Sequence, residues 1–409
     1  MDKRIKWVAG TGSRGGRGSA GVSLGFLGRD VAVETRRFIA TFPQYSITPL
    51  RSLDRLADYT GIAAIYVKDE SLRFGLNSFK VLGGGHAIGR YLAGLLNTGQ
   101  DMFSYENLRS KEAREITGEI TFTSATDGNH GRGVAWAAQQ LGHRAVINMP
   151  RGSSPVRLGH ITATGAEGYI TDVNYDETVR ITANNAKKNG WVVVQDTAWE
   201  GYEDIPNWVM QGYTVMADEA LEQLKEQKVE KPTHVFIQAG VGSLAAAVLG
   251  YYASVFGEER PLTVVIEPHK ADCFYRSAKA GDGKPRFVTG DLDTIMAGLA
   301  CGVPNPVAWD ILGKLADMFI SCPDYIAANG MRILGNPLDG DDRVVSGESG
   351  AVTAGMLFEL LKREELKEAK QQLQLDENSR VLLFSTEGDT DPLMYRRIVW
   401  DGEFTRRVQ

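Results

Sequence analysis

One lysine stands where an amine could act as a nucleophile. Lys80 follows an apolar run, residues 63–67, that predicts a strand, and it precedes three glycines and a helical pattern of apolar residues. The positive end of a helix and low-polarity surroundings both favour the neutral amine. A neutral amine can form a Schiff base with a carbonyl compound. Position alone favours an ordinary exposed lysine, because most lysines are exposed. The loops elsewhere in the chain therefore decide between these readings.

A glycine loop follows another predicted strand, residues 233–237, and precedes a helix. It reads Gly240-Val241-Gly242-Ser243. Small residues let the backbone approach an anion, and the start of the helix adds N–H donors. The loop lacks the G-K-[ST] ending of a nucleotide P-loop, so it suits one phosphate monoester better than a nucleoside triphosphate. A tight turn without a ligand is the alternative.

A third loop, Thr126-Asp127-Gly128-Asn129-His130, also lies between a strand and a helix. Its backbone amides and the Thr126 hydroxyl could hold a carboxylate. Asp127 would place a negative charge beside that anion, which is costly unless the charge meets a cation or acts as a base. Alternatively, Asp127 caps the next helix.

Ser385 and Thr386 follow the last predicted core strand, residues 381–384. They supply hydroxyl groups that could serve a site, or they belong to an ordinary polar loop. Ligands in open α/β sheets bind at the carboxyl ends of strands. The lysine and all three loops fall at such ends, so we expect them to form one site.

Strands and helices alternate regularly from residue 119 onward. This alternation predicts an α/β protein with two domains, each a mainly parallel twisted sheet covered by helices. We expect an N-terminal arm over 1–44, a large domain from 45–82 and 201–409, and a small domain over 83–200. We also expect residue Asp176 to cap a helix and residues 364–379 to form a solvated connection.

Composition excludes several classes of protein. The 409 residues carry a net charge of -6, which gives no nucleic-acid footprint. No run of ~18 apolar residues predicts a membrane span, and no apolar stretch follows the charged N-terminus as a secretory signal would require. We therefore expect a cytoplasmic protein.

The cysteines and one glycine motif have ordinary explanations. Cys273, Cys301 and Cys322 show neither CxxC nor zinc-like spacing, so we expect no metal site and buried free thiols, with a Cys273–Cys301 bridge left open. Residues 10–15 fit G-x-G-x-x-G, and Glu34 follows at a suitable distance. The preceding strand would be very short and no helical pattern follows, so a flexible arm is the better interpretation.

Together these pieces resemble the fold-type II pyridoxal-phosphate (PLP) enzymes, the tryptophan-synthase-β group. The matching stretches are residues 48–50, 78–80, 128–130, 240–242 and 385–386. Within the group, four longer stretches resemble the diaminopropionate ammonia-lyases: residues 73–80, 126–136, 195–201 and 385–391. The resemblance runs from about residue 45 to the end of the chain, and the glycine-rich residues 10–28 depart from it.

The resemblance implies a role for each cofactor-binding group. Lys80 would hold PLP as a Schiff base, and the amides from Gly240 through Val241 and Gly242 to Ser243 would bind its phosphate. Asn129 would bond the phenolic oxygen. Ser385 or Thr386 would face the pyridine nitrogen, where a hydroxyl makes the ring a weaker electron sink than a carboxylate would.

The resemblance also implies a reaction, the elimination of 2,3-diaminopropionate to pyruvate and two ammonia. Asp127 and Lys80 would act as bases on opposite faces of Cα, so that both the D and L isomers react. Asp196 is a further acid for the second amino group. Residues of the substrate site would be Thr126, Asp127, Gly128, His130 and Asp196. The family suggests a homodimer. A serine/threonine dehydratase-like ammonia-lyase and a non-catalytic ligand sensor are the alternatives.

Overall fold

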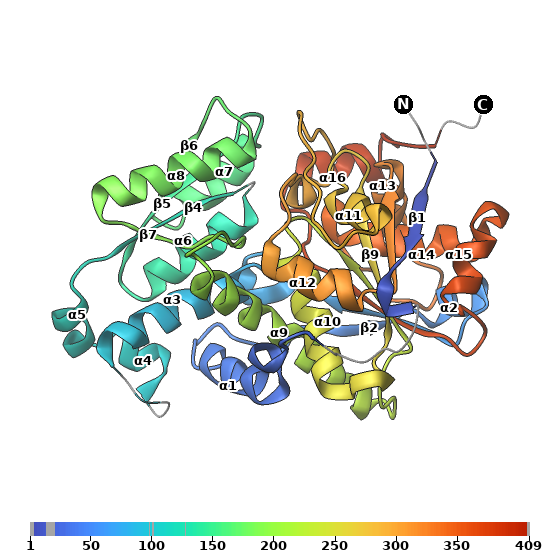
Figure 1. Ribbon diagram of the computed structural model, residues 1–409, viewed down its shortest axis with the longest axis horizontal. Coiled ribbons are helices and arrows are strands. Elements are labelled where there is room, and N and C mark those ends of the chain that lie inside the picture. The colour runs from blue at the N-terminus through green and yellow to red at the C-terminus, as the bar shows by residue number, and fades with distance from the viewer. Residues whose placement is uncertain (1–3, 14–20, 98, 100–101, 127, 407–409) are drawn as a thin grey trace.

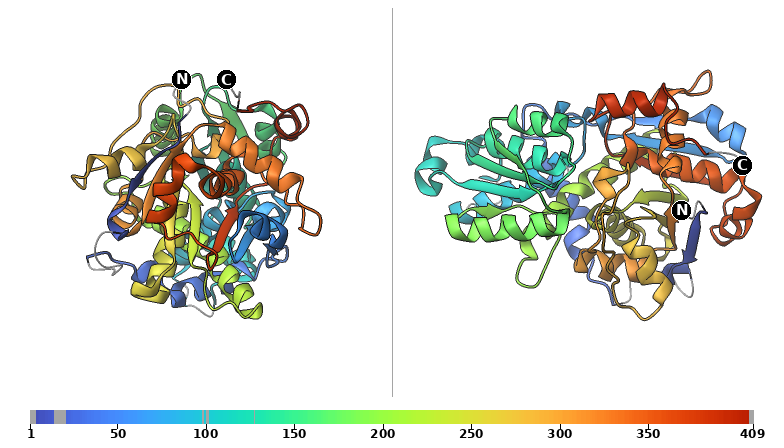
Figure 2. Two further views of the ribbon diagram at one scale, coloured as in Figure 1. Left: turned by 90° about the vertical axis from the view of Figure 1, so that its right-hand side faces the viewer. Right: turned by 90° about the horizontal axis from the view of Figure 1, so that it is seen from above.

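The structure is a computed structural model that describes residues 4–13, 21–97, 99, 102–126 and 128–406 (Figure 1). Two sheets organise the chain. We call the seven-stranded sheet with its helices the large lobe, and the four-stranded sheet with its helices the small lobe. Figure 2 shows the two lobes side by side along the longest axis of the molecule. The expected α/β class, with two mainly parallel sheets, is confirmed.

The large sheet has the strand order β1-β10-β9-β8-β11-β3-β2. Its five inner strands are parallel, and the edge strands β1 and β2 pair antiparallel to their neighbours. Inner strands are buried along nearly their whole length, which matches their continuous apolar runs. The strands are β1 Lys6–Ala9, β2 Leu50–Ser52, β3 Ala64–Asp69, β8 His234–Gln238, β9 Leu262–Pro268, β10 Met318–Cys322 and β11 Arg380–Ser385.

The small sheet has the order β6-β5-β4-β7 and is parallel throughout. Its strands are β4 Thr121–Ala125, β5 Arg144–Met149, β6 Glu167–Ile170 and β7 Val192–Val193. All four lie within the predicted small domain, 83–200. The exact domain boundaries remain a prediction.

Helices cover both sheets, and α3 packs against both α9 and α6. The α-helices are α1 Arg29–Ile39, α2 Asp54–Thr60, α3 Val81–Leu96, α4 Tyr105–Leu108, α5 Lys111–Thr117, α6 Asn129–Gln140, α7 Pro155–Thr162, α8 Tyr175–Asn189, α9 Asp204–Glu226, α10 Ser243–Phe256, α11 Cys273–Ala280, α12 Pro306–Leu315, α13 Tyr325–Gly335, α14 Glu348–Lys362, α15 Lys367–Gln372 and α16 Pro392–Val399.

Three local features differ from the sequence expectations. Residues 6–9 and 29–39, expected in an N-terminal arm, form the edge strand β1 and the helix α1, which packs on α9. Asn174, two residues before Asp176, caps α8 by accepting from Glu177 N. The connection after residue 364, expected to be solvated, contains α15 and buries four apolar side chains. Its burial depends on packing against distant parts of the chain, which its local polarity does not reveal. These four are Leu366, Ala369, Leu373 and Leu375.

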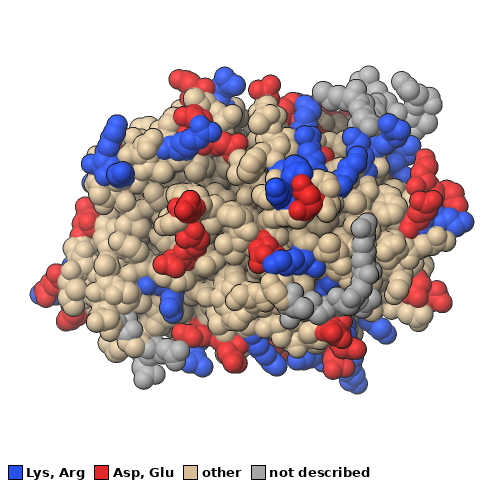
Figure 3. Space-filling view, in the orientation of Figure 1, with Lys and Arg blue, Asp and Glu red and all other residues tan. Residues whose placement is uncertain are grey.

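The surface carries charges of both signs. On the face drawn in Figure 3, Lys and Arg side chains are interspersed with Asp and Glu side chains. None of the helices in the described ranges combines the length and the apolar character needed to span a bilayer.

A fully buried charge cluster joins α9 to the end of β3 and the segment after it. Lys68 Nζ and Arg73 Nη2 lie 2.8 and 2.7 Å from Glu219 Oε2, and Arg73 Nε lies 2.9 Å from Glu70 Oε2. Burial alone would raise the pKa of Glu219, but Arg73 and Lys68 lower it to about 2. The cluster therefore balances two cations with two carboxylates, and it ties α9 to the segment that leads to Lys80.

We expect Glu219→Gln to lower the free energy of unfolding by about 3–5 kcal/mol, because it leaves two buried cations with one carboxylate. Urea unfolding followed by circular dichroism measures the change. Glu222→Gln is the matched control on the same helix. Glu222 is half exposed, so its loss should cost about 1 kcal/mol or less. Similar losses in the two variants would contradict the role of the cluster.

The same cluster gives a pH dependence. Since the pKa of Glu219 is depressed from 4.5 to about 2, its contribution to stability is complete above pH 4.5 and is lost as the pH falls toward 2. The stability difference between the wild type and Glu219→Gln should therefore shrink over this acidic range.

Candidate functional site

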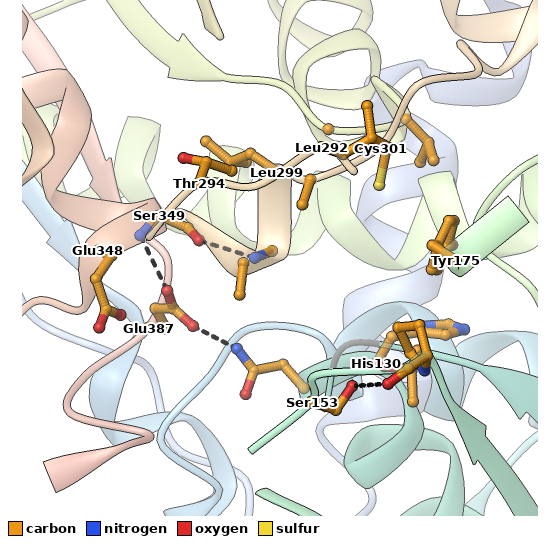
Figure 4. Close-up of a pocket in the computed structure, with 18 of the residues that line it drawn as sticks. His130, Ser153, Tyr175, Leu292, Thr294, Leu299, Cys301, Glu348, Ser349 and Glu387 are labelled. Carbon is orange, nitrogen blue, oxygen red and sulfur yellow. Dashed lines mark hydrogen bonds between the residues drawn. The ribbon is translucent and has the colours of Figure 1, made fainter. Parts of the chain in front are cut away.

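A cavity of about 650 Å³ lies between the two lobes. Its walls come from the Lys80 segment, the loop after β4, the loop after β8 and the loop after β11, as the sequence predicted for the strand ends. Figure 4 shows His130, Ser153 and Tyr175 from the small lobe facing Thr294, Glu348 and Glu387 from the large lobe. The structure thus brings the lysine and the three loops to one place.

Close helix packing fixes Lys80. The residue immediately precedes α3, and a Cβ on Gly83 would come within 2.6 Å of the Tyr213 ring on α9. A Cβ on Gly133 of α6 would likewise come within 2.8 Å of Val81 N. Glycines at these positions therefore let α9 and α6 approach the start of α3, which leaves the lysine little freedom to shift.

The Lys80 amine points into the cavity and meets a carboxylate. Lys80 Nζ lies 2.5 Å from Asp196 Oδ2, and it also lies 5.4 and 5.8 Å from the ring centres of Phe79 and Tyr213. Asp196 follows β7 of the small sheet. The pair thus spans the boundary between the lobes.

Asp196 is buried and held from several sides. Burial alone would raise its pKa, but Lys80 and His130 lower it to about 2. Its backbone carbonyl accepts a hydrogen bond of 2.5 Å from the Ser243 hydroxyl. The lysine and His130 therefore favour the anionic form of Asp196.

The Gly240–Ser243 loop forms a tight turn into α10. Gly242 has φ of 95°, and a Cβ there would come within 2.3 Å of Phe274. A Cβ on Gly240 would come within 2.9 Å of the Gly298 carbonyl oxygen. All four loop residues line the cavity, so the N–H groups at the start of α10 are available to an anion there.

The loop after β4 is folded by its own hydroxyl. Thr126 Oγ1 accepts from Gly128 N at 2.9 Å and from Gly131 N at 3.1 Å, and Gly128 has φ of 147°. Asn129 begins α6, and the His130 ring contacts the Val194 carbonyl oxygen at 2.8 Å. Thr126, Asn129 and His130 line the cavity, whereas Gly128 acts through the shape of the turn.

Asp127, predicted as a base, lies outside the described residues. Its neighbours place the loop at the cavity wall, and its role remains a prediction.

The structure separates the two hydroxyls after β11. Ser385 Oγ bonds to Ser346 Oγ at 2.8 Å behind the strand end, while Thr386 lines the cavity. Gln238 Nε2 donates to the Phe384 carbonyl oxygen at 3.2 Å and to Thr386 Oγ1 at 2.7 Å. Because the carbonyl can only accept, it fixes the amide orientation, and the Thr386 hydroxyl hydrogen is left for a partner in the cavity.

Several cavity residues were not predicted from the sequence. Glu348 and Ser349 begin α14, Arg157 lies on α7 and Tyr175 begins α8. The sequence around Glu348, Ser346-Gly347-Glu348-Ser349-Gly350, contains glycines and hydroxyls that could have marked a site. Nothing local connects it with the loops that carry the resemblance.

All three cysteines are buried and unbridged, as expected for free thiols, and Cys301 lines the cavity. The Cys273–Cys301 bridge left open by the sequence is not formed in this structure.

Comparisons with known proteins agree with this geometry. The sequence pattern of the family described as "Pyridoxal-phosphate dependent enzyme" matches residues 41–375. Diaminopropionate ammonia-lyase from Salmonella typhimurium is 49% identical over 383 residues, which cover 93% of this chain and 95% of that protein. Crystal structures of the Escherichia coli enzyme, in the holo form and with D-serine, are each 46% identical, cover 99% of both chains and have a TM-score of 0.90. The chain belongs to the diaminopropionate ammonia-lyases, within the pyridoxal-phosphate-dependent enzymes.

Proposed function

We propose that this protein uses PLP to eliminate the amino groups of D- and L-2,3-diaminopropionate. Water enters, and pyruvate and two molecules of ammonia leave. The observation that carries the proposal is the Lys80 amine, which points into a cavity between a glycine turn and Asn129 while facing the buried Asp196. Membership of the family supports the same reaction.

The donor set fits the cofactor. Lys80 supplies an amine for an aldehyde, the turn at Gly240–Ser243 supplies N–H groups for a phosphate, and Asn129 supplies an amide for a phenolic oxygen. Thr386 supplies a hydroxyl hydrogen for the ring nitrogen, so we assign this role to Thr386 and not to Ser385. When bound, the cofactor withdraws electrons from the substrate Cα and makes its proton acidic.

The charge of the cavity suits a substrate with two amino groups. Among the described residues, six carboxylates and three Lys or Arg side chains line it. The carboxylates are Asp196, Asp291, Asp293, Glu348, Glu387 and Asp391. A serine or threonine substrate has one amino group fewer and gains less from this excess of negative charge.

Two bases would serve the two isomers. In this proposal Lys80 takes the Cα proton from one face and Asp127 takes it from the other. Asp196 stays anionic, pairs with the lysine and stabilises the proton that the lysine gains. Thr126, Gly128 and His130 shape the loop that would receive the substrate carboxylate.

The dehydratase-like alternative has one specific support, since the related enzyme from E. coli has been crystallised with D-serine. Comparing pyruvate formation from D- and L-diaminopropionate, D- and L-serine and L-threonine separates the two functions. The proposal requires turnover of diaminopropionate with about two ammonia per pyruvate. Exclusive turnover of a hydroxy amino acid would overturn it. We also propose that the protein is cytoplasmic and forms a homodimer. Sedimentation analysis of the purified protein tests the dimer.

We expect Lys80→Ala to lose both the yellow colour of the cofactor-loaded protein and pyruvate formation, because the alanine offers no amine. Visible absorbance of the purified protein measures the first effect. Lys111→Ala is the control, since Lys111 is an exposed lysine that pairs with Glu115 on α5, away from the cavity lining. It should keep colour and activity. A normal spectrum in Lys80→Ala would rule out this lysine.

We expect Asp127→Asn to lose activity on one isomer, the D form, by about 10²-fold or more, because an amide cannot accept the proton. Rates with the L isomer in the same preparation are the internal control and should change much less. Equal losses on both isomers would contradict the two-base assignment.

A further inference from the structure

We propose that Glu387 is a positioning residue that orients Asn129 toward the cofactor across the boundary between the lobes. The inference rests on the proposed function, in which Asn129 bonds the phenolic oxygen of PLP. Glu387 is one of several carboxylates that line the cavity, and its contacts single it out for this further role.

Glu387 contacts the amide of Asn129 directly. Asn129 Nδ2 donates to Glu387 Oε2, and Ser349 N donates to Glu387 Oε1 at 3.1 Å. Figure 4 shows both bonds converging on the one carboxylate. Both oxygens accept from N–H donors, which suits the ionised form. An amide nitrogen has two hydrogens, so this contact fixes one and aims the other.

The carboxylate is itself held rigidly. Only 2% of Glu387 is exposed, its carbonyl accepts from Gly347 N at 2.9 Å, and its backbone bridges to Ser78, two residues before Lys80. A side chain fixed at its base and at both oxygens can impose an orientation on its partner. Through Glu387, both the Lys80 segment and the Asn129 amide are held by the loop after β11.

A second buried acid supports this arrangement. Burial and the charge of Glu387 raise the pKa of Glu348 to about 7, with a smaller contribution from Asp391, while Arg157 at 3.9 Å acts in the opposite direction. Glu348 can therefore carry a proton at pH values where Glu387 accepts from two N–H groups. The pair avoids two adjacent buried charges.

The position of Glu387 also has an electrostatic consequence. A carboxylate behind the Asn129 amide favours protonation of the bound cofactor at its phenolic edge. Removing the charge should lower the pH midpoint of the visible absorbance change by about one pH unit. A residue that only supported the fold would leave this midpoint unchanged.

The decisive variant is Glu387→Gln. Its shape is preserved, but its amide no longer offers two acceptors to Asn129 and Ser349. We expect an intact fold and a yellow protein whose pH midpoint is lowered, with kcat reduced about 10- to 100-fold and KM changed less. Glu167→Gln is the control, because Glu167 lies on β6 outside the cavity lining, where it pairs with Arg144 at 2.6 Å. It should keep the wild-type midpoint.

A double-mutant cycle separates positioning from support. In an Asn129→Ala background, adding Glu387→Gln should no longer reduce kcat, because Glu387 acts through the amide. Independent, additive losses of kcat, or a wild-type midpoint in the single variant, would overturn the inference. If Glu387→Gln does not fold, Glu387→Asp carries the test. Its shorter side chain weakens the contact and should lower kcat, and an unchanged kcat would refute the role.

The wild-type protein separates a failure of the Glu387 role from a failure of the proposed function. A wild-type protein that takes up PLP and becomes yellow, combined with an unaffected Glu387→Gln spectrum and kcat, overturns only the positioning role. A wild-type protein that stays colourless with PLP overturns the proposed function and this inference together.

Discussion

An ion pair between the partly buried Lys80 and the buried Asp196 sets the geometry of the whole site. The lysine begins a helix packed against the large lobe, and the aspartate follows a strand of the small lobe. Opposite charges this close, and largely removed from water, require accurate placement on both sides, because removing charges from water costs free energy. The tight glycine contacts around α3 and the Ser243 bond to Asp196 supply that placement. Lys80, Asp196 and Ser243, which these contacts hold in place, all line the cavity.

Much of the fold and of the site could be predicted because it depends on local sequence patterns. The strand before Lys80, the helices after each loop and the alternation that gives parallel sheets all depend on residues close in sequence. The rule that ligands bind at the carboxyl ends of strands then gathers Lys80 and the three loops without knowledge of the strand order. The resemblance added roles to residues that were already placed together.

Other features could not be predicted because they depend on contacts distant in sequence. Lys6–Ala9 form a strand only because β10 offers them an edge, more than 300 residues later. Glu219 and Arg73 are ordinary charged residues in sequence, yet they are fully buried together. Glu387 appeared within a stretch that carries the resemblance, but its contact with Asn129 joins two lobes and has no local signature. Choosing Thr386 over Ser385 likewise required the side-chain directions at the end of β11.

The glycine contacts around α3 separate positions that must stay glycine from cavity positions that can accept other side chains. Gly83, Gly133 and Gly212 have no room for a side chain, because the added carbon would enter a neighbouring helix. An engineer who wishes to alter substrate preference would leave these positions fixed in a mutant library. Diversity belongs instead at cavity-wall positions outside these glycine contacts, such as Arg151 and Ser153.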